Sequence, residues 1–211
     1  MILYISSYKL GNKTDVLTQW IGENSNQIAL IPNSRDAYPD GERKDRGLAG
    51  DVRSLEELGF DVTVLSLKNY FGKQERLRAE LRAFSAFFAV GGNTFVLRRA
   101  MKRSGFDACL KELSGSDHYL YGGYSAGICL LAPNMHGIEL ADDPAADPYG
   151  CEAIYEGLGL IDYLPVPHYR SDHPESEAME GVVEYLNNNG IKYVTLRDGD
   201  VIIENTCSLG K

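Results

Sequence analysis

A serine flanked by two glycines is the feature of this sequence that could do chemistry. Gly123, Ser125 and Gly127 have the G-x-S-x-G spacing of a nucleophile elbow, a sharp turn between a strand and a helix. The apolar residues before the turn and the helix-compatible residues 128–132 after it supply that frame. Glycines avoid collisions at such a turn, and its strained backbone aims the serine hydroxyl outward. We therefore predict that Ser125 is a nucleophile.

The position of Ser125 also predicts part of an oxyanion hole. Near a helix N-terminus, free N–H groups and the helix dipole favour developing negative charge, and the N–H of Ala126 is the natural donor. A second glycine pair, Gly91 and Gly92, follows another apolar strand and allows backbone N–H groups to approach a ligand. That turn alone is equally compatible with a plain connection. Together with Ser125, it favours a second oxyanion donor.

A serine becomes nucleophilic when a base accepts its proton, and the chain has four histidines for this role. His168 follows an extended apolar segment with prolines and leads into a polar loop, so it is the best-placed base, with His173 in reserve. His136 follows soon after the elbow helix and remains open as a candidate. His118 begins the strand that ends at Ser125, which places it at the wrong end of the sheet.

The base in turn needs a carboxylate that holds its tautomer and stabilises the imidazolium. In the chain order serine, histidine, acid, Asp198 at a strand end is the first choice. An Asp-Gly pair is also typical of a plain hairpin turn, and the residues alone leave both interpretations open. Cys129, one helical turn after Ser125, fits a small buried core residue better than a second nucleophile.

Metal and cofactor motifs are missing from the sequence. Segment 135–155 is rich in carboxylates, but it lacks the residue order of a calcium loop, so we predict an acidic loop or small hairpin over the site. The four cysteines are scattered without a C-x-x-C pair, which favours free thiols over disulfides or a zinc site. Neither phosphate-loop glycine motif is present. We expect no metal and no cofactor.

The composition indicates one globular domain over residues 1–211. A hydrophobic fraction of 44% supports a sizeable core, and no linker divides the chain. A net charge of −9 without a basic cluster disfavours nucleic acid and anionic membranes as partners. The first residues lack the features of a signal peptide, and no apolar run is long enough to span a bilayer. We therefore expect a cytoplasmic location.

Apolar runs alternate with helical patterns along the chain, which predicts an α/β fold of three layers with a doubly wound, mostly parallel sheet. Sites in such folds lie beyond the carboxyl ends of the strands. Near the end of the chain, two strands are expected to form a hairpin around Asp198 and Gly199. The other predicted strands are 1–6, 27–32, 61–67, 86–90 and the run before the elbow, and the predicted helices are 13–21, 41–58, 74–84, 95–103 and 175–188.

Four segments resemble, in order and approximate spacing, the peptidase E (α-aspartyl dipeptidase) family. They are 90–95 (Val-Gly-Gly-Asn-Thr-Phe), 123–127 (Gly-Tyr-Ser-Ala-Gly), 167–169 (Pro-His-Tyr) and 196–199 (Leu-Arg-Asp-Gly). The resemblance covers nearly the whole chain. It implies a fold similar to class I glutamine amidotransferases, which is flavodoxin-like, and a relation to cyanophycinases. Because those amidotransferases use cysteine at the elbow, a glutaminase is disfavoured.

The same resemblance implies roles for individual residues. It implies Ser125 as nucleophile, His168 as base, and Asp198 as the acid where the family usually has glutamate. It also implies oxyanion donors from the turn at 91–92 and from Ala126. The chain departs from enterobacterial members, which read Gly-Trp-Ser-Ala-Gly-Ala at the elbow.

Enterobacterial members also carry arginines in the helix after the histidine, whereas segment 175–186 contains none. Recognition of an N-terminal aspartate needs a cation against its carboxylate. Arg170 and Arg35 are candidates for that cation, and Asn93 and Tyr124 are candidates for further substrate contacts.

From these observations we expect a serine-type dipeptidase that hydrolyses short peptides, with an N-terminal aspartate preferred, through a Ser-His-Asp triad and an acyl-enzyme. One alternative is a related amide hydrolase of the cyanophycinase or isoaspartyl type. Another is a catalytically silent protein that binds a peptide or metabolite. The expected partner is a small peptide substrate, and the protein would be a monomer or a homodimer.

Overall fold

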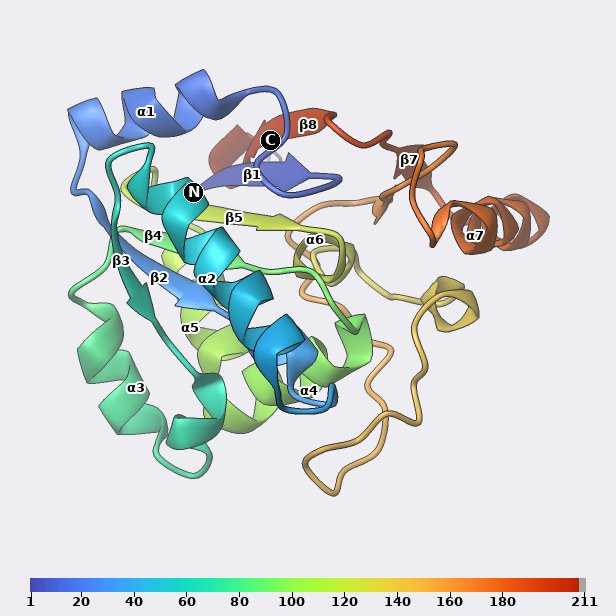
Figure 1. Cartoon of the computed structure of the whole chain (residues 1–211), viewed down its shortest axis with the longest axis horizontal. Helices are drawn as coiled ribbons and strands as arrows, with labels where there is room; N and C mark the ends of the chain where they lie inside the picture. The colour runs from blue at the N-terminus through green and yellow to red at the C-terminus, as the bar shows by residue number, and fades with distance from the viewer. Residues whose placement is uncertain (209–211) are drawn as a thin grey trace.

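The structure is a computed structural model that describes residues 1–208, and its centre is a six-stranded sheet (Figure 1). The strand order is β3, β2, β4, β5, β1, β8, and neighbouring strands are parallel except β1 with β8. Two more strands, β6 and β7, form a separate parallel pair. The strands are β1 (Ile2–Ser6), β2 (Gln27–Ile31), β3 (Asp61–Val64), β4 (Ala86–Ala89), β5 (Leu120–Tyr124), β6 (Leu164–Val166), β7 (Tyr193–Thr195) and β8 (Val201–Asn205).

Helices connect the strands and cover both faces of the sheet (Figure 1). Within residues 1–208, none of them is both long enough and apolar enough to cross a membrane. The α-helices are α1 (Thr14–Glu23), α2 (Glu42–Glu56), α3 (Gln74–Leu81), α4 (Thr94–Ser104), α5 (Phe106–Leu113), α6 (Ala126–Cys129) and α7 (Ser176–Asn188).

Two hydrophobic cores, one on each face of the sheet, produce the three layers. Successive residues of β1 point to opposite faces, so Leu3 belongs to one core and Tyr4 to the other. Leu17 of α1 and Leu55 of α2 pack in the second core, whereas α3, α4 and α5 pack in the first. Burial of strands on both faces is typical of parallel sheets with helical connections. The predicted three-layer, mostly parallel α/β fold is confirmed.

The predicted hairpin around Asp198 and Gly199 is wrong. The two strands flanking this turn do exist, but β7 pairs with β6, and β8 pairs with β1 at the edge of the main sheet. The turn therefore passes from one sheet to another. The chain reaches His168 directly after β6, and β1 lies beside the elbow strand β5 in the main sheet. The crossing from β7 to β8 therefore brings Asp198 to the place where the two sheets meet.

The elbow helix is shorter than predicted. Residues 128–132 are expected to be helical, but α6 ends at Cys129. Beyond it, the carbonyls of residues 130–132 accept hydrogen bonds from the N–H groups of residues 158–160, so this backbone pairs with a returning segment. Pro133 follows at once. Tertiary hydrogen bonds thus replace the helical ones that the local sequence allows.

Two other stretches also differ from the sequence prediction. Helix α5 was not predicted; it begins directly after Gly105, whose φ of 80° ends α4. Segment 135–155 is loop with a single short 3-10 turn and contains no hairpin. It packs on α4, where Arg99 donates to four of its backbone carbonyls. The order of this loop comes from a buried arginine of a distant helix.

Close approach of β4 and β5 explains the elbow glycines. Ala89 of β4 pairs with Gly123 of β5. A Cβ atom on Gly127 would lie 2.4 Å from the Ala89 carbonyl oxygen, and one on Gly123 would lie 3.0 Å from the same atom. Backbone oxygen cannot move aside as a flexible side chain can, so the elbow requires glycine at these positions.

We predict that Gly127→Ala destabilises the protein by about 3 kcal/mol, since the added methyl overpacks a backbone contact. Gly181→Ala is the matched control: Gly181 lies inside α7 with open space around its Cβ position. In a helix, this second change should stabilise by about 0.5–1 kcal/mol. Urea unfolding measures both free energies. Equal stability of the two variants would contradict the packing argument.

Candidate active site

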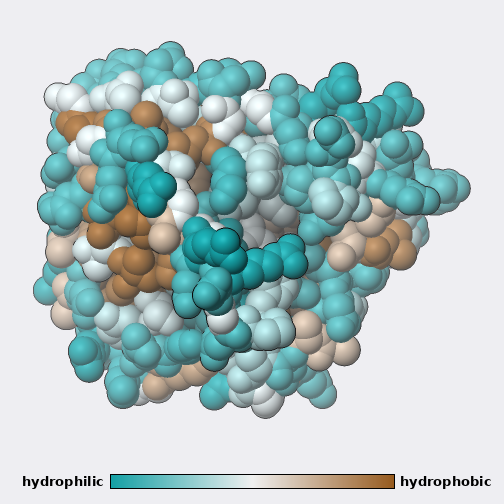
Figure 2. Space-filling view, viewed as in Figure 1, coloured by the Kyte–Doolittle hydropathy of each residue, from teal (hydrophilic) through white to brown (hydrophobic). Residues whose placement is uncertain are grey.

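The carboxyl ends of β4 and β5 form one side of a cleft of about 260 Å³. Ser125 and His168 both line this cleft, although 42 residues separate them in the chain. Figure 2 shows a hollow near the middle of the face. In the same view in Figure 1, α6 lies near this position, with α2 on one side and α7 on the other. The residues lining the cleft are Tyr8, Lys9, Arg35, Tyr38, Arg43, Gly91, Gly92, Tyr124, Ser125, His168, His173 and Glu175.

Ser125 has the backbone geometry of an elbow. Its φ of 50° and ψ of −116° put a non-glycine residue in a strained conformation directly before α6. The residue is 8% exposed. Its N–H donates to the Ser7 carbonyl at 3.2 Å, which anchors the turn to the end of β1. Within residues 1–208 the Ser125 hydroxyl makes no hydrogen bond to His168 or to another residue, so it is free to meet a ligand in the cleft.

His168 and Asp198 form a close pair. The distance between His168 Nδ1 and Asp198 Oδ1 is 2.6 Å. An ionised carboxylate only accepts hydrogen bonds, so Nδ1 carries the proton and Nε2 keeps a lone pair. The Asp198 N–H donates to Ser171 Oγ at 2.8 Å, which fixes the turn that carries the acid. This arrangement can hold the imidazole in one tautomer and stabilise its protonated form.

One residue that the sequence reasoning missed, Ser7, contacts all three of these groups. Its carbonyl accepts a hydrogen bond from the backbone N–H of Ser125, and its hydroxyl accepts one from the backbone N–H of His168 at 2.9 Å. The same hydroxyl donates to Asp198 Oδ1 at 3.1 Å. Ser7 is fully buried directly after β1. The sequence feature that could have indicated Ser7 is its position directly after β1, the strand that pairs with the elbow strand β5.

The environment of His168 keeps the ring neutral. Burial lowers its pKa below the ordinary value of 6.5, and nearby His173 lowers it further, whereas the Asp198 carboxylate raises it. His173 stacks on His168 with 3.7 Å between ring centroids and planes only 7° apart. His173, the reserve candidate for the base, therefore lies in the cleft as a neighbour of the first choice. A neutral imidazole is the form that can accept a proton.

Glu175 is another cleft residue that the sequence reasoning missed. It precedes α7, and its Oε2 lies 3.8 Å from His168 Nε2. Burial raises the pKa of this carboxyl, and the Asp198 charge raises it further. The His168 ring thus has a carboxylate near each of its two nitrogens: Asp198 at Nδ1 and Glu175 near Nε2. Its position directly after the polar loop that follows His168 was the only local signal.

Backbone N–H groups are available where an oxyanion would form. Within the described residues, the N–H groups of Gly92 and Ala126 donate to no protein acceptor, whereas the Gly91 N–H interacts with the Tyr124 hydroxyl. Gly92 has a φ of 152°, and a Cβ atom there would lie 2.7 Å from the Ser34 carbonyl oxygen, so this close turn needs glycine. The two glycines and Ala126 come from the ends of adjacent strands. The arrangement suits stabilisation of a negatively charged oxygen.

A buried carboxylate neutralises two of the cations in the cleft. Asp51 of α2 is 5% exposed and pairs with Lys9 Nζ at 2.7 Å and with Arg35 Nη1 at 2.8 Å. Tyr124, the residue before Ser125, donates its hydroxyl to Asp51 at 3.0 Å and accepts from Arg35 Nη2 at 2.5 Å. Arg35 and Tyr124 line the cleft, but their polar groups also brace the elbow against α2.

Arg43 of α2 is the third cation of the cleft, and it was not predicted from the sequence. In the described part of the chain, no carboxylate lies within ion-pair distance of its guanidinium. It is exposed and lines the same cleft as Ser125. Its electrostatic interaction with Tyr38 lowers the pKa of that phenol, while burial raises it more strongly. Arg43 is therefore a cation available to a ligand.

Several residues considered from the sequence lie outside the cleft. The Asn93 side chain caps α4 by accepting the Val96 N–H and donates to the Asp143 carbonyl. Arg170 is exposed, with its guanidinium 5.1 Å from the Tyr169 ring centroid. No residue of segment 135–155 lines the cleft. Asp142 of this segment nevertheless interacts electrostatically with the cleft residues Tyr38 and Glu175, and the position of the acidic loop over the site stays a prediction. The other residues outside are His136, which stacks on Tyr155, and His118, which precedes β5.

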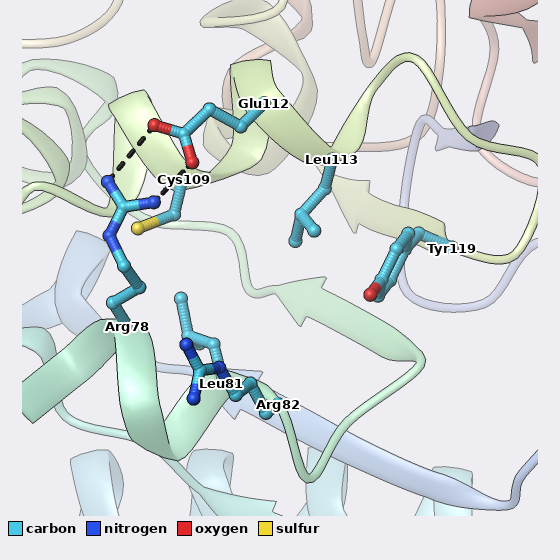
Figure 3. A pocket seen from close by; sticks show the side chains of 7 residues that line it. All are labelled: Arg78, Leu81, Arg82, Cys109, Glu112, Leu113 and Tyr119. Atoms are coloured by element: carbon cyan, nitrogen blue, oxygen red, sulfur yellow. Dashed lines mark hydrogen bonds and ion pairs between the residues drawn. The ribbon is translucent and has the colours of Figure 1, made fainter.

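A second cavity of the described residues lies away from this cleft. The cavity in Figure 3, of about 220 Å³, lies between α3 and α5, and Arg78 of α3 forms a two-pronged ion pair with Glu112 across it. Cys109 points toward it, but burial raises the pKa of this thiol, which disfavours the reactive thiolate. None of its lining residues belongs to the cleft at Ser125.

A metal-like spacing occurs among two histidines of the cleft and the neighbouring Asp198. His168, His173 and Asp198 each place one donor atom within 4.8 Å of the others, and this is the group of described residues that could hold a metal ion. The 2.6 Å contact between His168 and Asp198 already pairs two of these donors with each other. The contacts of these three side chains are thus a histidine–aspartate pair and a stacked second histidine.

The doubly wound sheet, the strained serine between β5 and α6, and the nearby histidine–aspartate pair place the protein among α/β proteins with a nucleophile elbow. Residues 2–207 match the model of peptidase family S51. The chain belongs to this family and is a serine peptidase. The resemblance to the peptidase E family is confirmed.

Individual relatives agree with this family. The chain is 28% identical over 158 residues to the uncharacterized peptidase Lin0382 of Listeria innocua, covering 71% of the chain and 72% of that protein. It is 32% identical over 127 residues to peptidase E of Streptomyces coelicolor, covering 57% and 49%. It is 30% identical over 151 residues to a Drosophila melanogaster protein assigned as an alpha-aspartyl dipeptidase, covering 69% and 58%. The aligned part thus spans about half of each of the last two proteins.

A solved structure shows the same fold. The crystal structure of a Listeria monocytogenes protein assigned as a peptidase E superposes with a TM-score of 0.73 at 23% identity. The match covers 97% of this chain and 98% of that one. The predicted likeness to the flavodoxin-like fold of class I glutamine amidotransferases is confirmed.

We predict that the pKa of His168 lies below 6.5 in the folded protein, because burial disfavours the charged ring. His173→Gln removes a neighbour that lowers this pKa, so the pKa should rise relative to wild type. Asp198→Asn removes the group that raises it, so the pKa should fall further. Nitrogen-15 NMR titration of the imidazoles measures all three. A wild-type value above 6.5, or the opposite order of the variants, would contradict this electrostatic account.

Proposed function

We propose that Ser125, His168 and Asp198 form the catalytic triad of this peptidase. The observation that carries the proposal is the shared cleft, which is lined by both the strained elbow serine and a histidine already paired with a carboxylate. The chain order serine, histidine, acid agrees with the family resemblance of the four sequence segments. Asp198 takes the place of a glutamate in that pattern, and both side chains supply the same carboxylate acceptor.

In this mechanism, the Ser125 hydroxyl attacks the carbonyl carbon of the peptide bond. The proton passes to His168 Nε2, and the resulting imidazolium is stabilised by Asp198. The N–H groups of Gly92 and Ala126 stabilise the oxyanion, and Gly91 is a further donor. Protonated His168 then gives its proton to the leaving amine as the bond breaks. Water, activated by the same imidazole, hydrolyses the acyl-enzyme.

We further propose that the substrate is a dipeptide with an acidic first residue. The names of two relatives, peptidase E and alpha-aspartyl dipeptidase, support this substrate class. An acidic side chain needs a cation, and among the candidates Arg43 fits best because Arg35 already pairs with Asp51 and Arg170 lies outside the cleft. Arg43 on α2 thus replaces the arginines that enterobacterial members carry after the histidine.

Two other functions lead to different observations. A hydrolase of the cyanophycinase or isoaspartyl type on the same scaffold would cleave β-aspartyl bonds in preference to α-aspartyl bonds. A silent binding protein would keep the elbow without a reactive serine. The paired His168 and Asp198 favour a reactive serine, since a binding protein has no need of an oriented base.

We expect Ser125→Ala to lower dipeptide turnover by about three to six orders of magnitude with an unchanged melting temperature. A fluorophosphonate should label the wild-type protein on Ser125 and should not label this variant. Treatment with EDTA should leave turnover unchanged, since every proposed step uses side chains and backbone only. A wild-type protein that resists labelling would favour the silent binding protein.

We expect Arg43→Gln to lower the preference for Asp-Leu over Ala-Leu about 10- to 100-fold, because it removes a charge-assisted contact to the substrate carboxylate. Lys44→Gln is the matched control, since Lys44 is the next residue of α2 and does not line the cleft. Values of kcat/KM for Asp-Leu, β-aspartyl-leucine and Ala-Leu measure this. An unchanged preference would exclude Arg43 as the specificity residue, and faster cleavage of the β-linked peptide would support the isoaspartyl alternative.

A further inference from the structure

The catalytic cleft holds a carboxylate that neither the triad nor the oxyanion hole uses. Among the described residues that line the cleft, Glu175 is the only aspartate or glutamate. The cations Lys9 and Arg35 do not neutralise it, because both pair with Asp51. We propose that Glu175 binds the free α-ammonium group of the substrate. This assignment rests on the proposed dipeptidase function.

The position of Glu175 suits this role. In a dipeptide, the amino nitrogen is two bonds from the carbonyl carbon that Ser125 attacks. Both Ser125 and His168 must reach this carbon and its leaving group, so the ammonium lies close to His168 Nε2 during the reaction. Glu175 Oε2 is 3.8 Å from that nitrogen. The carboxylate is therefore placed where the substrate brings its positive charge.

The protein itself gives Glu175 no partner that satisfies it. With the imidazole proton on Nδ1, His168 presents a lone pair to the carboxylate and cannot donate a hydrogen bond to it. Glu175 precedes α7, yet its side chain makes no capping hydrogen bond. Its side chain is 39% exposed, open to the cleft. Burial and Asp198 both disfavour the ionised carboxyl, and a cation bound against it would relieve this cost.

This arrangement restricts the enzyme to the first residue of a peptide. A substrate with a blocked or extended amino terminus would lose the charged contact and would place a neutral amide against Glu175. Binding of the ammonium also draws the Glu175 charge away from His168 Nε2, so that this nitrogen faces the Ser125 hydroxyl. A free dipeptide would then both bind in the cleft and leave His168 Nε2 available to the Ser125 hydroxyl.

The test compares a substrate pair that differs only in the amino group: Asp-Leu and its desamino analogue, succinyl-leucine. In Glu175→Gln the ratio of kcat/KM for Asp-Leu to that for succinyl-leucine should fall about 10- to 100-fold, the usual effect of losing a hydrogen bond to a charged group. Glu177→Gln is the matched control, because Glu177 lies exposed in the first turn of α7 outside the cleft. It should keep the wild-type ratio.

If succinyl-leucine is cleaved too slowly to measure, binding can be compared instead. The concentrations of Asp-Leu and of succinyl-leucine that protect Ser125 from labelling by a fluorophosphonate then give the corresponding ratio of affinities. Equal losses for both compounds in Glu175→Gln would show that Glu175 only positions His168, and this would overturn the assignment. An unchanged ratio would overturn it as well, while leaving the dipeptidase function intact. A wild-type protein that neither cleaves nor is protected by any dipeptide would instead overturn the proposed function together with the assignment.

Discussion

The site depends on the hydrogen bonds of one buried serine at the end of the first strand. Ser7 uses its carbonyl for Ser125 and its hydroxyl for His168 and Asp198, so one residue sets the relative positions of three chain segments. A hydroxyl can accept one hydrogen bond while it donates another, and Ser7 uses both capacities. Buried polar groups that satisfy one another in this way are rigid, because each broken contact leaves an unpaired group away from water. The end of the sheet therefore holds the elbow and the His168–Asp198 pair together.

The strain at Ser125 is balanced by packing on either side. Ala89 lies against both elbow glycines, and the Asp51 cluster holds Tyr124 from the opposite face. A non-glycine residue with positive φ persists only where its surroundings determine it. The buried Asp51 would itself be costly without partners, and the two cations and the tyrosine hydroxyl supply them. The polar residues around the elbow thus have a mechanical role in addition to their place in the cleft.

Charge in the cleft is arranged in two parts. The Asp51 cluster is internally neutralised. Within residues 1–208, by contrast, neither Glu175 beside the neutral His168 ring nor Arg43 on α2 has an ion-pair partner of opposite charge. A small ligand with both an ammonium and a carboxylate group would complement both ends. In the proposed function, a strongly acidic chain binds an acidic peptide because the local charges decide binding, while the net charge acts only at longer range.

The amino-acid sequence by itself determined the parts that depend on local geometry: the alternating strands and helices and the glycine-lined elbow at Ser125. It also named His168 and Asp198 as candidates for the same site. It did not determine that the strands beside Asp198 belong to different sheets, since strand pairing is a long-range choice that a turn signal does not encode. Ser7, Glu175 and Arg43 carry no motif. Glu175 and Arg43 line the cleft, and Ser7 contacts His168 and Asp198 from beneath it, only because the fold brings distant strand and helix ends together. Residue type and spacing specify a turn and its strain, whereas the partners of each charge are decided by tertiary packing.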